Sequence, residues 1–302
     1  MSHERISRRQ FLGKTAAIAG GAVLSARSLL AQEAVSKATD LVPLGKTGVK
    51  ICRLGMGTGS NGGQVQRELG QEAFTKLLRY GYERGVTYID TADAYQMHEM
   101  VRQATKGLPR DKLYIQTKVQ WRSGIPEKPL EVIDRFRKEL GTDYLDSLLI
   151  HCVDTTDWDT KLKKLMDALS DAKEKKIIRL KGMSCHGLPG LTRAAQVDWV
   201  DVNLVRVNPQ GRHCDGEAGK WAEPGNIAEA TKHIKIMHEK GRGVIGMKII
   251  GNGDFTRAED REKSVRHAMT CGFLDAIVIG VKSPAEIDEA IERMNAALAE
   301  KK

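Results

Sequence analysis

The stretch LYIQTKVQWRSGIPEKPLEVIDRFRKELGTDYLDSLLI, residues 113–150, contains one full repeat of the pattern that decides the fold. It opens with a short apolar and β-branched run over 113–118, which predicts a strand. A longer amphipathic run over 129–140 follows. Pro129 in its first turn and Gly141 just past its end are typical of a helix. The apolar run over 144–150 predicts the next strand, so the stretch is a strand–helix–strand unit.

The same alternation continues through the chain from residue 51 onward. The predicted strands are 51–56, 87–90, 113–118, 144–150, 178–184, 199–205, 243–248 and 276–280. The predicted helices are 72–84, 98–106, 129–140, 160–175, 188–195, 227–239, 257–270 and 284–299. Eight such units in about 250 residues fit a closed (β/α)8 TIM barrel. An open doubly wound sheet is the alternative, but its GxGxxG turn does not follow the first predicted strand. We therefore expect one α/β domain over residues 41–298.

The composition is that of a globular protein: the 302 residues are 41% hydrophobic and 29% charged, with a net charge of +9. Only 5% are aromatic, which argues against a surface that stacks on single-stranded nucleic acid. The five cysteines contain no CxxC pair. The run His213-Cys214-Asp215 has no further ligand at a fixed spacing, so we expect no metal site. No stretch is apolar over the roughly 20 residues that a membrane-spanning helix needs.

Residues 1–31 are predicted to be an export signal that is separate from the fold. Ser7-Arg8-Arg9-Gln10-Phe11-Leu12 has the twin-arginine pattern, and a run of small and apolar residues follows over 15–26. Leu29-Leu30-Ala31 is an acceptable cleavage site. The segment holds five basic residues against one acidic residue, a contribution of +4 to the +9, and the remaining +5 demands no nucleic-acid partner. We expect the twin-arginine machinery as a partner and a periplasmic or otherwise exported protein, with a cytoplasmic location as the alternative.

Polar side chains stand where successive predicted strands end, which is the end of a TIM barrel that carries active sites. Asp90 ends the second strand with Tyr95 just beyond it, Lys118 ends the third, and His151 follows the fourth. A phenol has an ordinary pKa near 10, and a neighbouring ammonium would lower that pKa by stabilising the phenolate. An imidazole would orient a carbonyl oxygen, and an organic cofactor would supply a hydride. Taken singly, Asp90 is more often a cap, Lys118 a solvated rim residue and His151 a core histidine. Their order at successive strand ends favours the catalytic interpretation of the set.

These residues lie in motifs that resemble those of the aldo/keto reductases. The matching stretches are Leu44-Gly45-Lys46-Thr47-Gly48, Leu54-Gly55-Met56-Gly57-Thr58-Gly59, Tyr88-Ile89-Asp90-Thr91-Ala92-Asp93-Ala94-Tyr95, Gln116-Thr117-Lys118, Asp143-Tyr144-Leu145-Asp146 and Leu149-Ile150-His151. The resemblance implies a nicotinamide-dependent (β/α)8 barrel. It also implies that Tyr95 is the general acid/base, that Lys118 and Asp90 tune it, and that His151 orients the substrate.

The resemblance further implies where NADP or NAD would bind. At the nicotinamide end, Ser184 is the residue that the family usually carries. Cys185 replaces an asparagine, Leu204 a glutamine, and Met247 an aromatic residue that stacks on the ring. Because a thiol is a poor partner for an amide, the placement of the nicotinamide ring departs from the family's pattern.

At the phosphate end the candidate cofactor-binding residues are Gly57, Thr58, Gly280, Lys282, Glu286 and Glu289. The glycines allow close backbone approach, and the helix that starts after Lys282 offers amides to an anion. Glu286 stands where NADP-preferring relatives carry an arginine for the 2′-phosphate, and Glu289 matches the family's adenine-contacting glutamate. Glu286 favours NAD, whereas Lys282 and the usual preference of the family favour NADP.

The sequence therefore predicts an NAD(P)-dependent oxidoreductase that acts on a small aldehyde, ketone or sugar and its alcohol. A non-catalytic nicotinamide-binding barrel, used as a sensor or scaffold, is the alternative because the ring contacts are altered. The loops predicted over 120–127, 153–159 and 209–224 would shape the substrate pocket. Since no soluble pool of NAD(P)H exists outside the cytoplasm, we expect an exported protein to carry its nicotinamide with it.

Overall fold

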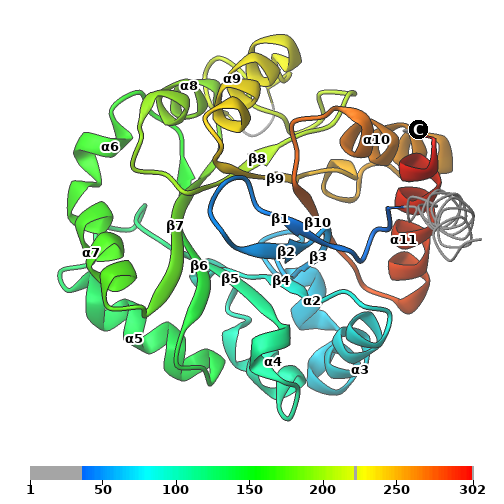
Figure 1. Ribbon diagram of the computed structural model, residues 1–302, viewed down its shortest axis with the longest axis horizontal. Helices are drawn as coiled ribbons and strands as arrows, with labels where there is room; N and C mark the ends of the chain where they lie inside the picture. The colour runs from blue at the N-terminus through cyan, green and yellow to red at the C-terminus, as the bar shows by residue number, and fades with distance from the viewer. Residues whose placement is uncertain (1–35, 221–222, 301–302) are drawn as a thin grey trace, which may run out of the picture. The chain divides into compact units, whose positions relative to one another are not determined.

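The computed structural model describes residues 36–220 and 223–300, and the predicted export signal lies outside the described residues. Eight parallel strands close into a barrel in the order β10-β3-β4-β5-β6-β7-β8-β9. Their order around the barrel is their order along the chain, and helices surround them (Figure 1). The predicted (β/α)8 TIM barrel is confirmed, and it forms a single domain.

The barrel strands differ from the predicted ranges at their ends, the predicted strand over 51–56 is divided in two, and the strand over 41–43 was not predicted. They are β1 (Leu41–Pro43), β2 (Lys50–Cys52), β3 (Leu54–Gly57), β4 (Tyr88–Asp90), β5 (Tyr114–Val119), β6 (Leu145–Val153), β7 (Ile178–Cys185), β8 (Val202–Arg206), β9 (Gly243–Met247) and β10 (Ala276–Gly280). All but the first two belong to the barrel.

Helices connect the barrel strands. They are α2 (Gln64–Glu68), α3 (Gly70–Glu83), α4 (His98–Thr105), α5 (Pro129–Leu140), α6 (Trp158–Lys161), α7 (Lys163–Glu174), α8 (Leu188–Gln196), α9 (Ile227–Glu239), α10 (Ala258–Thr270) and α11 (Pro284–Ala299). Short 3-10 turns are η1 (Asp93–Tyr95), η2 (Arg110–Lys112) and η3 (Gly251–Gly253). As predicted, Pro129 begins α5, and Gly141 ends it in the left-handed region with φ 64°.

The prediction of a single strand over 51–56 is wrong, because Arg53 separates two strands with different partners. β2 pairs antiparallel with β1, whereas β3 pairs with β10 and β4 in the barrel. Leu44 and Ile51 of the hairpin pack with the apolar side chains inside the barrel. The amide of Lys46 donates to the carbonyl of Gly241, just before β9 begins. The hairpin therefore closes the N-terminal end of the barrel (Figure 1).

A divided helix and a lengthened strand also differ from the prediction. The predicted helix over 160–175 is interrupted at Leu162, which separates α6 from α7. The predicted strand over 144–150 continues to Val153, past a register shift between Ile150 and Val153. Cys152, within this shift, has a φ of 56°. The Cys152 amide donates to Ser184 Oγ at 2.9 Å, so this amide keeps a hydrogen-bond partner despite the register shift. His151 consequently lies inside β6.

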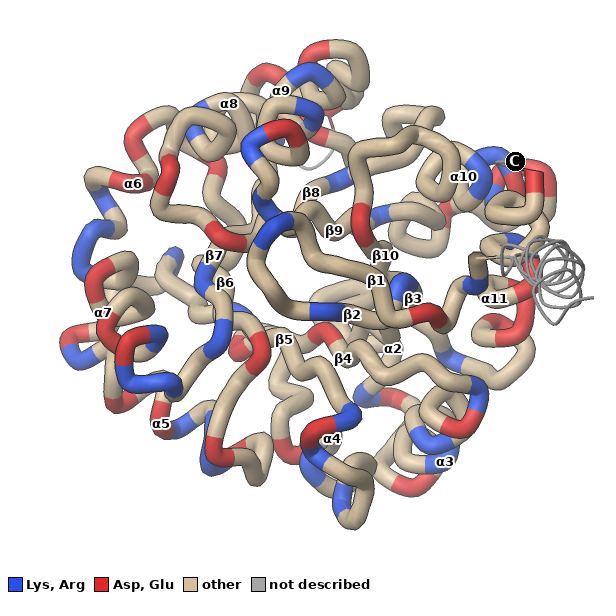
Figure 2. The backbone as a smooth tube through the Cα atoms, viewed as in Figure 1, with Lys and Arg blue, Asp and Glu red and all other residues tan. Residues whose placement is uncertain are grey.

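The outer helices carry acidic and basic residues close together (Figure 2). Many of these charges pair within one helix, as Lys163 does with Asp167 at 2.7 Å. Within residues 36–220 and 223–300, no helix is both long and apolar enough to cross a membrane. The absence of a nucleic-acid partner stays a prediction.

Candidate active site

The C-terminal end of the barrel gathers polar side chains because residues two apart on a strand face the same side. Tyr88 on β4 and Leu149 on β6 belong to the apolar cluster inside the barrel. Asp90 and His151 follow them by two positions, so their side chains turn into the mouth. Lys118, near the end of β5, meets Asp90 there.

The Lys118 ammonium is held by three oxygens. Its Nζ donates to Asp90 Oδ1, Asp90 Oδ2 and the carbonyl of Thr91, each at 2.8 Å. Lys118 is 1% exposed and Asp90 is 5% exposed. Because the ion pair is buried and saturated with hydrogen bonds, the charge of Lys118 has a fixed position.

A polar relay beneath this pair, which the sequence reasoning missed, fixes Asp90. Gln116 Nε2 donates to Asp90 Oδ1 and to Tyr88 Oη, both at 2.8 Å. Ser147 Oγ donates to Gln116 Oε1 at 2.7 Å. Gln116 stands two positions before Lys118 on the same face of β5, and that spacing is the signal that could have revealed it.

Tyr95 reaches the mouth from η1, just past β4. Its hydroxyl lies 3.5 Å from His151 Nε2, and its ring centroid lies 4.9 Å from Lys118 Nζ. A Cβ on Gly59 would stand 2.4 Å from the Tyr95 ring, so only a glycine leaves room for the phenol there. The structure thus brings the four predicted catalytic residues, Asp90, Tyr95, Lys118 and His151, to one place.

The electrostatics of the pair Tyr95–His151 differ from the expectation. Burial, and next the charge of Asp90, raise the pKa of Tyr95 well above its ordinary value. The expected net lowering by Lys118 is wrong for this state, because burial outweighs the effect of the ammonium, which pairs with Asp90. Burial, and next the charge of Lys118, lower the pKa of His151 well below its usual range. The site therefore holds a protonated phenol beside a neutral imidazole.

The loop after β5 fixes His151 from outside the barrel. Trp121 Nε1 donates to the His151 carbonyl at 2.6 Å. The His151 and His186 rings lie edge to face with centroids 6.2 Å apart. The hydrogen bond from Trp121 ties the loop that carries it to the end of β6.

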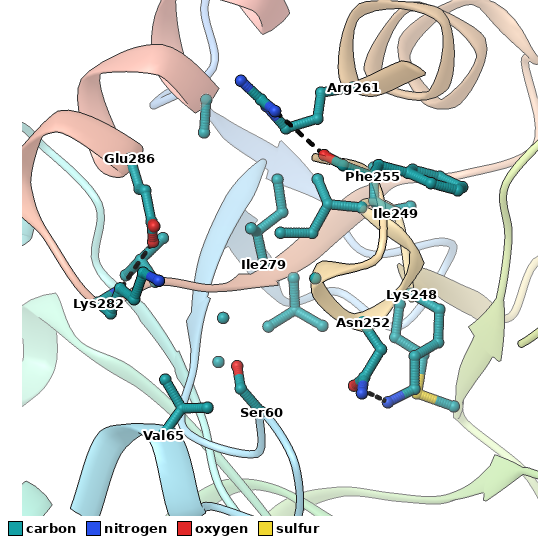
Figure 3. Close-up of a pocket in the computed structure, with 18 of the residues that line it drawn as sticks. Ser60, Val65, Lys248, Ile249, Asn252, Phe255, Arg261, Ile279, Lys282 and Glu286 are labelled. Carbon is teal, nitrogen blue, oxygen red and sulfur yellow. Dashed lines mark hydrogen bonds between the residues drawn. The ribbon is translucent and has the colours of Figure 1, made fainter. Parts of the chain in front are cut away.

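A cavity of about 470 Å³ is lined by Asp90 and Tyr95, by residues at the ends of β3, β9 and β10, and by the start of α11. Figure 3 shows Ser60, Lys248, Lys282 and Glu286 around it. Gly57, Gly59 and Gly280 contribute no side chain to its wall. A Cβ on Gly280 would stand 2.0 Å from Ser60 Oγ. The glycine backbone, the apolar side chains and the basic residues Lys248 and Lys282 of its lining suit a dinucleotide that reaches Tyr95 with one end.

Six of the predicted cofactor residues line this cavity: Gly57, Met247, Gly280, Lys282, Glu286 and Glu289. Three others do not. Thr58 Oγ1 donates to the Asp90 carbonyl at 3.1 Å, and Ser184 Oγ accepts from Cys152. Cys185 is fully buried and packs against Met183 in the core outside the barrel interior.

The cavity wall also holds charged and polar residues that the sequence reasoning missed. Lys248 follows Met247 in the left-handed region, φ 62°, and donates to Asn252 Oδ1 at 2.8 Å. Arg261 of α10 and Arg293 of α11 both donate to Glu289 Oε1, at 2.7 and 2.8 Å. In the sequence, Lys248 lies between an apolar strand and a Gly-Asn-Gly turn, and this position could have identified it as a site residue. The two arginines have the pattern of ordinary surface charges.

The side chains of His213-Cys214-Asp215 go to separate partners. His213 Nε2 lies 3.0 Å from Asp254 Oδ2, and Cys214 is buried near the Asn208 carbonyl. Asp215 Oδ1 accepts from the Gly187 amide at 2.8 Å. Across residues 36–220 and 223–300, no three His, Cys, Asp or Glu side chains come together as metal ligands would.

Known proteins share both the sequence pattern and this fold. A methylglyoxal reductase of Salmonella typhi is 31% identical over 44% of this chain and 51% of its own length. A 9,11-endoperoxide prostaglandin H2 reductase of Trypanosoma cruzi is 30% identical over 53% of this chain and 54% of its own. This chain thus spans about half the length of the curated relatives that it matches.

A solved aldo-keto reductase from Bacillus halodurans, in its holo form, superposes on 87% of this chain and 96% of its own, with a TM-score of 0.65. At 16% identity that likeness shows the fold alone. The sequence model of the aldo/keto reductase family matches residues 53–300, which is most of the described barrel. The chain belongs to the aldo/keto reductase family.

Proposed function

We propose that this protein is an NAD(P)-dependent oxidoreductase that transfers a hydride between a nicotinamide and a small carbonyl or alcohol. The observation that carries the proposal is the meeting of Tyr95, His151 and the Lys118–Asp90 pair at one end of a cavity that suits a dinucleotide. When bound, the nicotinamide supplies the hydride. Every other requirement of carbonyl reduction is met by the chain's own side chains.

Each side chain then has one task. The neutral His151 and the Tyr95 hydroxyl, 3.5 Å apart, hold the carbonyl oxygen between them. As negative charge develops on that oxygen, Tyr95 gives up its proton and the product is the alcohol. The Lys118 ammonium, held by Asp90, stabilises the phenolate that remains, and solvent reprotonates it. In the oxidation direction the same steps run backwards.

We propose small aldehydes and ketones as substrates. Methylglyoxal is the first to test, because a relative that is 31% identical is a methylglyoxal reductase. The test adds such carbonyls to the protein with NADH or NADPH, follows the loss of reduced-nicotinamide absorbance, and identifies the alcohol by mass. Binding of both ligands without formation of any alcohol across the panel would contradict the proposal.

Lys248 predicts a pH dependence of dinucleotide affinity. Burial lowers the pKa of Lys248 to about 8. Below pH 8 its ammonium attracts the pyrophosphate, and above that pH the charge is lost as the amine deprotonates. Since a hydrogen bond to a charged group contributes about 1.5–3 kcal/mol, we expect affinity to fall roughly tenfold or more between pH 7 and 10.

Titrations at several pH values measure this effect. The variant Lys248→Met is expected to bind weakly at all these pH values, with little further loss at high pH. The exposed Lys232→Met, on α9, serves as the matched control and should keep the wild-type profile. A wild-type affinity that stays flat from pH 7 to 10 would refute the role given to Lys248.

We also propose that the protein is exported by the twin-arginine route with its nicotinamide bound. The pattern Ser7-Arg8-Arg9-Gln10-Phe11-Leu12 supports this, and a route for folded proteins suits a barrel that binds its cofactor before export. Fractionation of cells that express the full chain should find it in the periplasm, and in the cytoplasm when Arg8 and Arg9 are both replaced by Lys. An equal distribution of the two forms would refute the proposal.

A further inference from the structure

The far end of the cavity carries a built-in anion. Glu286, in the first turn of α11, lines the cavity, and its Oε2 accepts a hydrogen bond from the Lys282 amide at 2.8 Å (Figure 3). We propose that Glu286 makes this protein selective for NAD(H) over NADP(H). The inference rests on the proposed function and goes beyond it, since that function is compatible with either dinucleotide.

The positions of the acid/base residues decide which half of a dinucleotide meets Glu286. Hydride and proton go to the two atoms of one carbonyl group, so the nicotinamide must lie next to Tyr95. Tyr95 and Asp90 line one end of the cavity. The adenosine half must then occupy the other end, whose wall includes Lys282, Glu286 and Glu289.

At that end the place where a phosphate would bind is filled by the chain itself. The N-terminus of a helix attracts anions through its free amides and its dipole. In the 16-residue α11, the Ser283 side chain accepts from the Glu286 amide, and the Glu286 carboxylate takes the amide of Lys282. A 2′-phosphate that binds here would either displace the Glu286 carboxylate or lie against it. Since the phosphate and the carboxylate are both negative, they would repel each other.

The arginines nearby already hold other partners. Arg261 Nε donates to Glu289, and its Nη1 donates to the carbonyl of Phe255 at 3.1 Å. Arg293 Nε donates to the same carboxylate, and its Nη1 donates to Glu262 Oε2 at 2.7 Å. To clasp a 2′-phosphate they would have to leave these carboxylates, which would themselves remain close by.

Lys282 is the cation that opposes this selectivity. Its side chain is exposed, so water and salt screen its charge, whereas Glu286 is half-buried. The hydroxyls of an unmodified ribose can donate to the Glu286 carboxylate, which is an acceptor only. The geometry therefore favours binding of a ribose diol and disfavours binding of a phosphate dianion.

The test is equilibrium binding of NADH and NADPH to the full chain, read by quenching of tryptophan fluorescence. We expect wild type to bind NADH about tenfold or more tightly than NADPH. Glu286→Gln keeps the size and an acceptor oxygen but removes the charge, and it should reduce the ratio to within about threefold. Glu286→Arg should invert the preference. Glu292→Gln, an exposed change on the same helix, is the matched control and should keep the wild-type ratio.

The outcomes separate the two proposals. Equal or tighter binding of NADPH by wild type overturns the selectivity and leaves the oxidoreductase proposal standing. A wild-type preference for NADH that survives Glu286→Gln, with the variant folded by circular dichroism, assigns it to other residues and also overturns the inference. Failure of both dinucleotides to bind overturns the selectivity and the proposed function together.

Discussion

Replacing Tyr95 by Phe is expected to lower carbonyl reduction by about 10²–10⁴-fold while dinucleotide affinity stays nearly unchanged. The change removes only the hydroxyl that lies 3.5 Å from His151 Nε2, and the ring that fits beside Gly59 remains. Because burial keeps the phenol protonated, we expect Tyr95 to act as the proton donor of the site throughout the neutral range. Without it, the developing oxyanion has only the neutral imidazole.

Steady-state kinetics and a binding titration on the same samples separate the two effects. The matched control is Tyr144→Phe, because Tyr144 stacks on Arg110 just before β6 begins, at the opposite end of the barrel. It should keep wild-type turnover. If Tyr95→Phe retained more than about a tenth of wild-type kcat, Tyr95 would not be the general acid, since such catalysis contributes far more than that.

Replacing Lys118 by Met is expected to damage both stability and activity. The ammonium makes three hydrogen bonds of 2.8 Å, two of them to Asp90, and both side chains are almost fully buried. Removing one partner of a buried ion pair leaves a charge without compensation and costs about 3–5 kcal/mol. Catalysis should fall as well, because the phenolate of Tyr95 would form beside Asp90 with no cation between them.

A double variant distinguishes these consequences. Asp90→Asn combined with Lys118→Met removes both charges, so urea unfolding should show most of the lost stability restored while turnover stays low. Lys112→Met, at an exposed position of η2, is the control for the loss of a lysine as such. A single variant Lys118→Met that unfolds at the wild-type urea concentration would show that the pair is not the buried, coupled unit described above.

Much of the fold follows from short-range pattern. The run over 113–150 predicted β5, α5 and β6 because apolar stretches of strand length alternate with a helix that Pro129 begins and Gly141 ends. These signals are local in the chain, and the closure of the barrel then follows from having eight units. The hairpin was not predicted because Ile51 and Leu54 are equally apolar, and only tertiary partners decide that Arg53 divides them.

The candidate site was predictable as far as strand ends define it. Asp90, Lys118 and His151 were placed by their position at the ends of predicted strands, where a TIM barrel carries its active site. The sequence does not show which polar groups on neighbouring strands contact each other. Gln116 under Asp90 and Arg261 against Glu289 depend on register and on the approach of two helices, and no local pattern encodes either.

The raised pKa of Tyr95 was unpredictable for a related reason. The residue types suggested a cation beside the phenol. The direction of the pKa shift, however, depends on which groups the cation hydrogen-bonds and on how deeply the phenol is buried. Both are properties of the assembled mouth. The roles proposed for Lys248 and Glu286 likewise depend on the cavity that both residues line together with Tyr95.

The most direct test of the central claim, that these side chains hold a carbonyl for hydride transfer, is a single turnover with a reduced cofactor that carries deuterium at both positions of the nicotinamide C4. In ordinary water, we predict an alcohol with one deuterium on the former carbonyl carbon, formed far more slowly by Tyr95→Phe. A product without deuterium at that carbon, or bound cofactor and carbonyl that never react, would contradict the account.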